Sequence, residues 1–443
     1  MKKIIAVMVA IVLLLLTSLC VVAETPVAIK TESDLKAISA KGNYYLANDI
    51  TLSGEFSPLE TFSGEFDGRG KKIINLTINV SATTSETIYG GLFKKIDGGQ
   101  VHDLTLEKAK ITVSGGKNVY LGAVCGKVVS GKVSNCRVSG EISVSAESGT
   151  AYVGGIVGSN GAQVQLCENL VNITVSAGHV LVGGILGEQT RSDYIIEKCV
   201  NKGNVTVTDK GDLGNVGGIV GKTVGNVENC ANYGAVSLSA SGYGYVGGIA
   251  ANIGGDVNNC FDGGKLVCNA KTDGYVDPIA AKIGENKAKN NYYLDTVIEG
   301  LITTDVKTAS ELEDRLISNL SVFSEFDFDT VWEMTNGGPV IKGITAAQIT
   351  PETLESETVS SESKLESAIS SSTDSAVEES TDQSSGQTES AESQTVSDVV
   401  NSQTLSEKTE SKQYFWILIG GLAVLLSAAA VCVVIWQKKK SEK

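Results

Sequence analysis

Histidine and carboxylate side chains are the first candidates for chemistry, and this chain has few of them in useful arrangements. Its 443 residues include only two histidines, His102 and His179, so a zinc site built from three histidines is excluded. The best isolated carboxylate is Asp67, which lies with Arg69 in the stretch Phe-Asp-Gly-Arg-Gly. That stretch predicts a turn, and we expect both histidines to be surface or turn residues.

Cysteine is the next reactive residue type, and five cysteines recur at one position of a repeat: Cys136, Cys167, Cys199, Cys230 and Cys260. Cys125 and Cys268 raise the number between the two chain ends to seven. An odd number at a repeated position favours buried thiols over disulfides. Strands stacked in register would also hold Cβ atoms about 4.8 Å apart, beyond the roughly 3.8 Å of a disulfide. We therefore predict structural thiols and no metal site.

A row of tyrosines is the candidate binding feature. The residue before each Val-Gly-Gly unit is tyrosine in four repeats: Tyr120, Tyr152, Tyr245 and Tyr275. On the outside of the molecule they would form two patches able to stack on sugar rings or on a partner protein. The alternative is an inward or half-buried aromatic stack, because both faces of that strand are apolar or glycine.

The repeat itself predicts the fold. Segments of the form Val-Gly-Gly-Ile-Val-Gly begin 29 to 34 residues apart between residues 89 and 281, and such a period marks a solenoid. After each repeated cysteine, inward and polar residues alternate with period two, which is typical of a β-strand with one buried face. The Asn or Asp two positions after the cysteine can hydrogen-bond to its counterpart in the next turn or cap a bend in the coil.

Thirty residues leave no room for a crossover helix. We therefore predict an all-β fold, a right-handed parallel β-helix of about seven turns over residues 61–295, with about three short strands per turn. Its open ends need covers. We expect an N-terminal cap over 24–60, with a helix starting at Thr31-Glu-Ser-Asp34. A C-terminal cap over 296–349 should contain a helix after Thr308-Ala-Ser-Glu311, and Trp332 and Pro339 should lie in its last part.

The two ends of the chain indicate the compartment. Residues 1–23 read as a signal peptide, with two lysines, an apolar run and small residues before Glu24. Residues 350–413 carry 14 acidic residues against 3 lysines and no aromatic residue, which predicts a disordered Ser/Thr/Glu-rich stalk. Residues 414–436 contain no charge and predict a transmembrane helix, followed by a basic cytoplasmic tail, 437–443.

Several segments carry a resemblance to a known family: Gly42-Asn-Tyr-Tyr-Leu-Ala-Asn-Asp-Ile50, Phe62 to Gly70, the Gly-Gly-Ile-Val-Gly units and Asp327 to Glu333. They resemble the GLUG-repeat proteins, bacterial surface β-solenoids that include the N-terminal region of IgA1-type metallopeptidases. The resemblance implies a secreted, surface-displayed β-helix, often in adhesin-like proteins. It does not imply protease activity, because neither histidine lies in the H-E-x-x-H motif of a zinc peptidase.

Function follows as an expectation. The net charge of −15 argues against nucleic acid as a partner. Polysaccharide-degrading β-helices place two or three acidic residues on neighbouring turns, and no acidic position recurs here. We expect no catalytic, cofactor-binding or metal-binding residues. The interpretation is a single-pass cell-membrane protein whose extracellular β-helix binds an unknown glycan or protein without catalysis. The alternatives are a polysaccharide-active enzyme and a structural surface-layer component.

Overall fold

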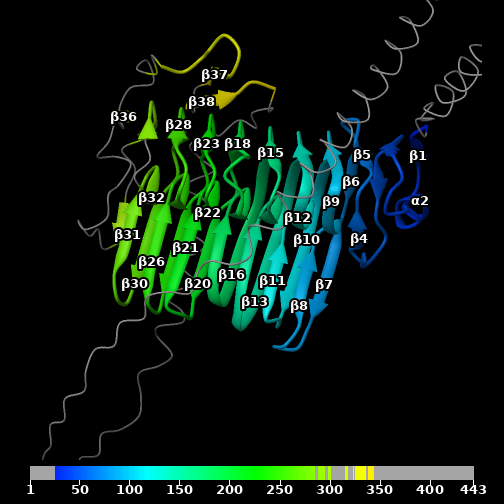
Figure 1. The fold of residues 1–443 in the computed structure, drawn as a ribbon, viewed down its shortest axis with the longest axis horizontal. Coiled ribbons are helices and arrows are strands. Elements are labelled where there is room, and N and C mark those ends of the chain that lie inside the picture. Colours follow the sequence, from blue (N-terminus) through cyan, green and yellow to red (C-terminus); the bar gives the residue numbers. More distant parts are fainter. Residues whose placement is uncertain are drawn as a thin grey trace, which may run out of the picture. The chain divides into compact units, whose positions relative to one another are not determined.

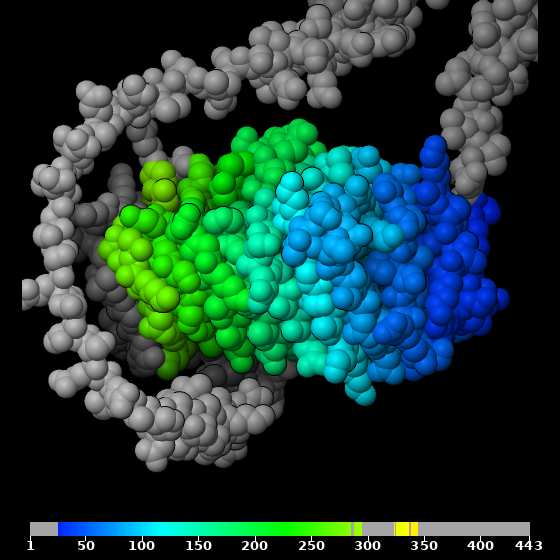
Figure 2. Space-filling view, turned by 90° about the horizontal axis from the view of Figure 1, so that it is seen from below, coloured from blue at the N-terminus to red at the C-terminus, as the bar shows by residue number. Residues whose placement is uncertain are grey.

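The computed structural model describes residues 25–284, 288–294, 298–300, 315–317, 323, 325–335 and 338–343. These residues form an all-β solenoid of about seven turns, whose strands pair in parallel from one turn to the next (Figure 1). The predicted all-β parallel solenoid of about seven turns is confirmed. In the space-filling view the turns follow one another along the body in sequence order (Figure 2).

The signal peptide, stalk, transmembrane and tail predictions fall outside these residues. Within the described part of the chain, no helix has the length and apolar character needed to cross a membrane.

The strands before the middle of the solenoid have the following bounds. The N-terminal part contains β1 (Val27–Ile29), α2 (Glu32–Lys36), β2 (Tyr44–Leu46), β3 (Ile50–Thr51), β4 (Leu59–Phe62) and β5 (Glu65–Asp67). The next turns contain β6 (Lys72–Ile74), β7 (Thr77–Ser81), β8 (Thr87–Gly90), β9 (Phe93–His102), β10 (Thr105–Ser114), β11 (Asn118–Leu121), β12 (Cys125–Ser134), β13 (Arg137–Gly154), β14 (Val157–Asn160), β15 (Gln163–Gln165), β16 (Glu168–Gly183) and β17 (Leu186–Gln189).

Each of the three turns after β17 consists of five short strands, rather than the three that we predicted. They are β18 (Ile196–Glu197), β19 (Val200–Asn201), β20 (Val205–Asp209), β21 (Leu213–Gly217) and β22 (Val220–Thr223); then β23 (Val227–Glu228), β24 (Ala231–Asn232), β25 (Val236–Ala240), β26 (Tyr243–Gly247) and β27 (Ala250–Ile253); then β28 (Val257–Asn258), β29 (Phe261–Asp262), β30 (Leu266–Ala270), β31 (Gly274–Asp277) and β32 (Ala280–Ile283). The additional strand ends are bends in the chain. A period-two alternation of apolar and polar residues does not show where such bends occur.

The remaining strands close the described chain: β33 (Ala288–Lys289), β34 (Tyr292–Leu294), β35 (Ile298–Gly300), β36 (Arg315–Ile317), β37 (Trp332–Thr335) and β38 (Gly338–Ile341).

One bend in every turn is made by a residue in the left-handed conformation. It lies directly before the repeated cysteine, or before the residue that takes its place, and the φ angles are 50° to 55° at Asn135, Leu166, Lys198, Asn229, Asn259 and Asn290. Asparagine tolerates this conformation, whereas leucine and lysine are strained in it. The chain therefore stores strain at Leu166 and Lys198.

Replacing Leu166 by Asn should relieve that strain. We expect Leu166→Asn to raise the free energy of unfolding by about 0.5 to 1 kcal/mol. The backbone keeps its positive φ at this bend, and asparagine tolerates that conformation better than leucine does. Chemical denaturation of the full-length chain measures the change. The matched control, Asn229→Leu at the same bend of a later turn, should lower stability by a similar amount. Equal stability of both variants would contradict the strain argument.

The predicted thiol ladder is confirmed. All seven described cysteines are free and buried. Each ladder thiol donates to the carbonyl oxygen two residues before it, as Cys167 does to Gln165 at 3.3 Å. Burial raises the pKa of Cys230 and of Cys125, so these side chains remain neutral thiols and fill the core as small apolar groups.

A second ladder, of buried amides, runs two positions further on. Asn169 donates from Nδ2 to Oδ1 of Asn201, Asn201 to Asn232, and Asn232 to Asp262, each at 2.8 Å. The same Nδ2 groups also donate to the carbonyl oxygen two residues ahead, at 3.1 Å for Asn169 and 2.9 Å for Asn201. These bonds confirm the prediction that this position links neighbouring turns.

Backbone approaches this amide ladder closely at the second glycine of each Val-Gly-Gly unit. A Cβ atom on Gly155 would lie 2.2 Å from Oδ1 of Asn169, and one on Gly184 would lie 2.2 Å from Cγ of Asn201. No side chain fits there, so the glycine is required by the ladder that it covers.

The N-terminal cap contains the predicted helix. Thr31 is the N-cap of α2, its hydroxyl accepts from the Asp34 amide, and the Asp34 side chain accepts from the Thr31 amide. Leu35 from this helix is fully buried. Parallel pairing begins already within this segment, because β1 pairs with β2 and β2 pairs with β5.

At the C-terminal end, a β-hairpin covers the outer side of several turns. Strands β37 and β38 pair antiparallel, and Trp332 is fully buried. Its ring stacks on Phe326 at 4.3 Å, and the Tyr233 hydroxyl donates to the Pro339 carbonyl. The hairpin thus buries an apolar row that faces away from the main core: Val200, Ala231, Phe261 and Tyr292.

The helix expected after Glu311 is wrong where the structure describes that stretch. Arg315–Ile317 forms β36, which pairs in parallel with β34. The last turn offers unpaired backbone groups at its edge, and satisfying them outweighs a local helical pattern. The rest of that prediction lies outside the described residues.

Candidate functional site

The four predicted tyrosines lie on the outer face of the solenoid, in two groups on β11, β13, β26 and β31 (Figure 1). Tyr120 pairs in register with Tyr152, and Tyr245 pairs with Tyr275. The flanking Val119 and Leu121 are fully buried, so the tyrosine between them points outward. The tyrosines thus form two outward patches, as the first interpretation predicted. Their rings are half-buried and stacked, as the alternative interpretation predicted.

A fifth tyrosine extends the first patch. Tyr89 on β8 pairs with Tyr120, and the Tyr89–Tyr120–Tyr152 rings are parallel within 9°, with centroids 5.1 and 4.6 Å apart. Tyr245 and Tyr275 stack in the same way at 4.8 Å. Leu181 and Asn215 occupy the two turns between the patches.

Stacking decides which part of each ring meets solvent. In such a column each ring covers a face of its neighbour, so the edges and hydroxyl groups point outward. Burial first, and then the neighbouring Tyr152, Tyr89 and Glu188 side chains, raise the pKa of Tyr120 to about 12. Its hydroxyl is therefore a neutral hydrogen-bond donor at physiological pH.

A second outward column runs beside the tyrosines, on the strand that follows the bend. Its members, in order of the turns, are Lys95, Lys127, Ser159, Glu188, Lys222, Asn252 and Lys282. The ammonium groups reach the rings: Lys95 Nζ lies 4.2 Å from the Tyr89 centroid, Lys127 Nζ 5.2 Å from that of Tyr120, and Lys282 Nζ 5.5 Å from that of Tyr245. We call the two columns together the tyrosine–lysine strip.

Sequence reasoning missed Tyr89 and the lysines for identifiable reasons. The motif alignment matched Tyr89 with Leu121, but Leu121 pairs with Gly90. The stretch from Tyr89 to Phe93 is one residue shorter than the stretch from Tyr120 to Cys125, with which it pairs. The motif alignment was therefore correct at Phe93 but displaced by one residue at Tyr89. The lysine column had a signal, since in each repeat from Tyr120 onward its member lies seven residues after the tyrosine position.

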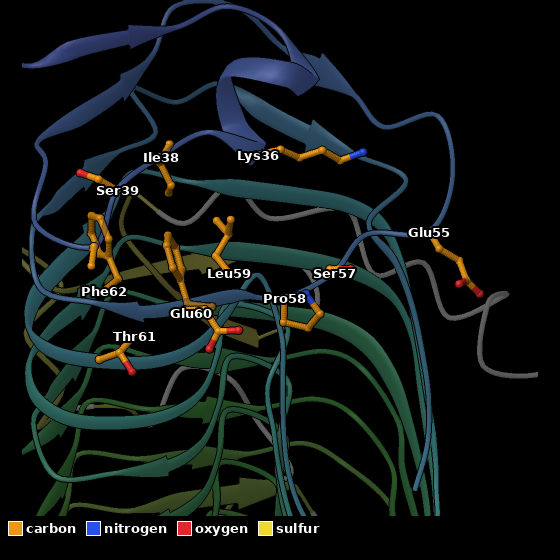
Figure 3. Close-up of a pocket in the computed structure, with 12 residues that line it drawn as sticks. Lys36, Ile38, Ser39, Glu55, Ser57, Pro58, Leu59, Glu60, Thr61 and Phe62 are labelled. Atoms are coloured by element: carbon orange, nitrogen blue, oxygen red, sulfur yellow. The ribbon is translucent and has the colours of Figure 1, made fainter.

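A hollow of about 510 Å³ opens at the N-terminal end, between α2 and β4. Ile38 and Leu59 face each other across it, and Glu60 and Thr61 of the same strand also line it (Figure 3). A neighbouring hollow of about 620 Å³ shares Glu55 and Glu60 with the first and is also lined by Tyr89. The first tyrosine stack therefore ends at this depression.

The two carboxylates of this depression are already engaged. Glu60 forms an ion pair with Lys94 at 2.5 Å, and Glu55 accepts a hydrogen bond from Asn79. They do not form a free acid/base pair in the arrangement described.

The clearest cluster of titratable groups is at the turn with Asp67. Asp67, His102 and Asp103 bring one ligand atom each within 4.8 Å of one another. His102 Nδ1 lies 2.7 Å from Asp103 and Nε2 lies 3.2 Å from Glu65. Burial lowers the pKa of His102, but hydrogen bonds to Asp103 and Glu65 outweigh it and leave the pKa raised.

Both ring nitrogens of His102 are engaged within the cluster, by Asp103 and Glu65, so we assign it no metal. Asp67 also accepts from the Arg69 amide at 2.8 Å, and Arg69 has φ +49°. The prediction of a turn at Asp67 and Arg69 is confirmed. His179 is exposed, as expected.

Comparisons with known proteins give limited likenesses. No family model matches the chain. Halomucin from Haloquadratum walsbyi is 31% identical over 115 residues, which are 23% of this chain and 1% of halomucin. Because the chain spans so little of halomucin, none of that protein's properties follows for it.

Two solved structures are also similar. One is a putative immunoglobulin A1 protease from Bacteroides ovatus, with TM-score 0.45 and 20% identity over 72% of this chain and 93% of that one. The other is an IgA1 protease, with TM-score 0.43 and 17% identity over 72% of this chain and 25% of that one. Scores this low carry no further argument, and the GLUG resemblance stays a prediction. The fold itself is read from the chain's own stacked turns, which form a parallel β-solenoid.

Proposed function

We propose that this chain is a cell-surface protein whose β-solenoid binds an extracellular glycan or protein without catalysis. Residues 414–436 would anchor it as a single transmembrane helix, and residues 350–413 would hold the solenoid away from the membrane. The observation that carries the proposal is the tyrosine–lysine strip, where five outward tyrosines and four lysines are aligned over the turns. Rigid aromatic side chains with a polar tip are well suited to binding surfaces.

Removing the middle ring of the first stack should weaken binding. We expect Tyr120→Ala to lower the affinity of the full-length chain by about tenfold or more for a glycan identified on an array, because it removes a donor and lets the stack collapse. The matched control is Tyr243→Ala, since Tyr243 is 43% exposed and outside both stacks. A normal affinity for Tyr120→Ala, or an equal loss for Tyr243→Ala, would contradict the proposed site.

A polysaccharide-active enzyme is the second candidate, because Glu55 and Glu60 both line one depression. To act as an acid/base pair they would have to leave their partners Asn79 and Lys94. Turnover of an extracellular polysaccharide, abolished by Glu55→Gln with folding intact, would replace the binding proposal. A structural surface-layer role would instead appear as self-association with no ligand.

A further inference from the structure

The lysine column gathers positive charge along one strip of an acidic protein. Elsewhere on the solenoid some lysines form ion pairs, as Lys110 does with Glu141 and Lys202 with Glu168. In the part of the chain that the structure describes, Lys95, Lys127, Lys222 and Lys282 form no ion pair. Four lysines without an ion pair therefore lie in one column.

One carboxylate interrupts that row. Glu188 occupies the same column, directly before Lys222. Burial raises the pKa of Glu188, and the charges of Lys222 and Lys127 oppose this shift. Glu188 also lies near enough to Tyr120 and Tyr152 to raise their pKa values. The column keeps a net positive charge, with its only negative group half-buried in the middle.

The neighbouring tyrosine edges determine what kind of anion fits. Both faces of the Tyr120 ring and one face of each of the other four rings are covered within the stacks. Flat bases, which single-stranded nucleic acid stacks on aromatic faces, therefore have few faces available. The hydroxyl groups at the ring edges can instead donate hydrogen bonds to a ligand, beside ammonium groups that supply charge. This pairing of neutral donors with cations suits carboxylate or sulfate groups carried among hydroxyl groups.

Spacing favours a linear polymer over a single small anion. Successive turns are about 4.8 Å apart, and the lysines are the first, second, fifth and seventh of the seven column members. Lys95 and Lys127 lie on adjacent turns, whereas Lys222 and Lys282 lie two turns apart. An extended chain lying along the solenoid would meet these charges one after another.

We propose that the tyrosine–lysine strip binds an acidic polysaccharide, with its carboxylate or sulfate groups at the lysine column and its hydroxyl groups at the tyrosine edges. This inference rests on the proposed function and names its ligand class. Attraction to an anionic polymer is screened by salt, which gives the proposal a direct readout.

The experiment compares alginate and heparin with neutral dextran and with polyglutamate, using immobilised polymer and the full-length chain. We expect binding to alginate or heparin, weakened about tenfold or more between low and high ionic strength. Dextran should bind weakly, and polyglutamate should bind less tightly than the acidic glycans because it lacks the hydroxyl groups.

Two variants test the column itself, one that removes a positive charge and one that removes the negative charge. Lys127→Met should lower the affinity for alginate or heparin about fivefold or more, whereas Glu188→Gln should raise it, because it removes the one negative charge. The matched control is Lys110→Met, which makes the same change in net charge on the outer face of β10. An unchanged unfolding midpoint verifies that each variant folds.

The outcomes separate the two proposals. Equal binding of dextran, with Tyr120→Ala weakened and Lys127→Met normal, would overturn the acidic ligand and leave glycan binding standing. Tighter binding of polyglutamate than of either glycan would point to an acidic protein and overturn the inference. Equal losses for Lys127→Met and Lys110→Met would show that only overall charge matters. No binding to any polymer would count against this inference and against the glycan branch of the proposed function.

Discussion

Asp262→Asn should make the protein more stable at neutral and alkaline pH, and the gain should grow between about pH 4 and pH 8. Asp262 ends the amide ladder, and its Oδ1 accepts from Nδ2 of Asn232 at 2.8 Å. Its other oxygen is buried without a hydrogen-bond partner among the described residues. Asparagine at this position would repeat the bonding of the three preceding turns, where Nδ2 also donates to the carbonyl two residues ahead.

The pH dependence follows from the protonation of that carboxyl group. Burial, with a smaller contribution from the Asp277 charge, raises the pKa of Asp262 to about 8 in the folded protein. Below about pH 4 the folded and unfolded chains both hold the proton, so the group costs nothing. Between about pH 4 and pH 8 only the unfolded chain releases it, and stability falls by up to about 1.4 kcal/mol per pH unit. Above the folded pKa the loss is constant.

The measurement is the difference in unfolding free energy between Asp262→Asn and the parent chain at pH 4 and pH 8. We expect a small difference at pH 4 and a gain of several kcal/mol at pH 8. The control, Asp212→Asn, makes the same change of charge at an exposed site and should leave the pH profile almost unaltered. A gain that is equal at both pH values would show that Asp262 is not the titrating group.

The interior of this solenoid could be predicted from sequence because each turn repeats it. Cysteine and asparagine recur two residues apart in consecutive repeats, and the same spacing returns as the thiol and amide ladders. The capping box at Thr31 is likewise local, since its two hydrogen bonds join residues three apart. Such features depend on neighbours in sequence or on identical positions in successive turns.

Features that depend on one particular turn could not be predicted from the repetition of the sequence. The outward direction of the tyrosines is set by strand register, whereas the flanking residues, Val119 and Leu121 or glycine, are consistent with either face. The shortened first repeat hid Tyr89. The pairing of β36 and the hairpin that covers Phe261 join segments distant along the chain, and no local pattern carries them.

The glycine over the amide ladder should be the least replaceable residue of the repeat, and Gly218 tests this. A Cβ atom there would lie 2.0 Å from the carbonyl oxygen of Gly248 and 2.3 Å from Cγ of Asn232. The first contact is with backbone of the next turn, and the second is with a buried amide held by hydrogen bonds to two partners. Neither can move without breaking the pairing of neighbouring turns.

We therefore expect Gly218→Ala to lower the free energy of unfolding by about 3 kcal/mol or more, or to prevent folding. Chemical denaturation followed by circular dichroism measures the first outcome, and loss of the β spectrum identifies the second. The matched control is Gly254→Ala in the following turn, where the added methyl group would meet nothing closer than 3.4 Å. That variant should be within about 0.5 kcal/mol of the parent. If both substitutions were tolerated equally, the amide ladder would have to be more deformable than its buried hydrogen bonds imply.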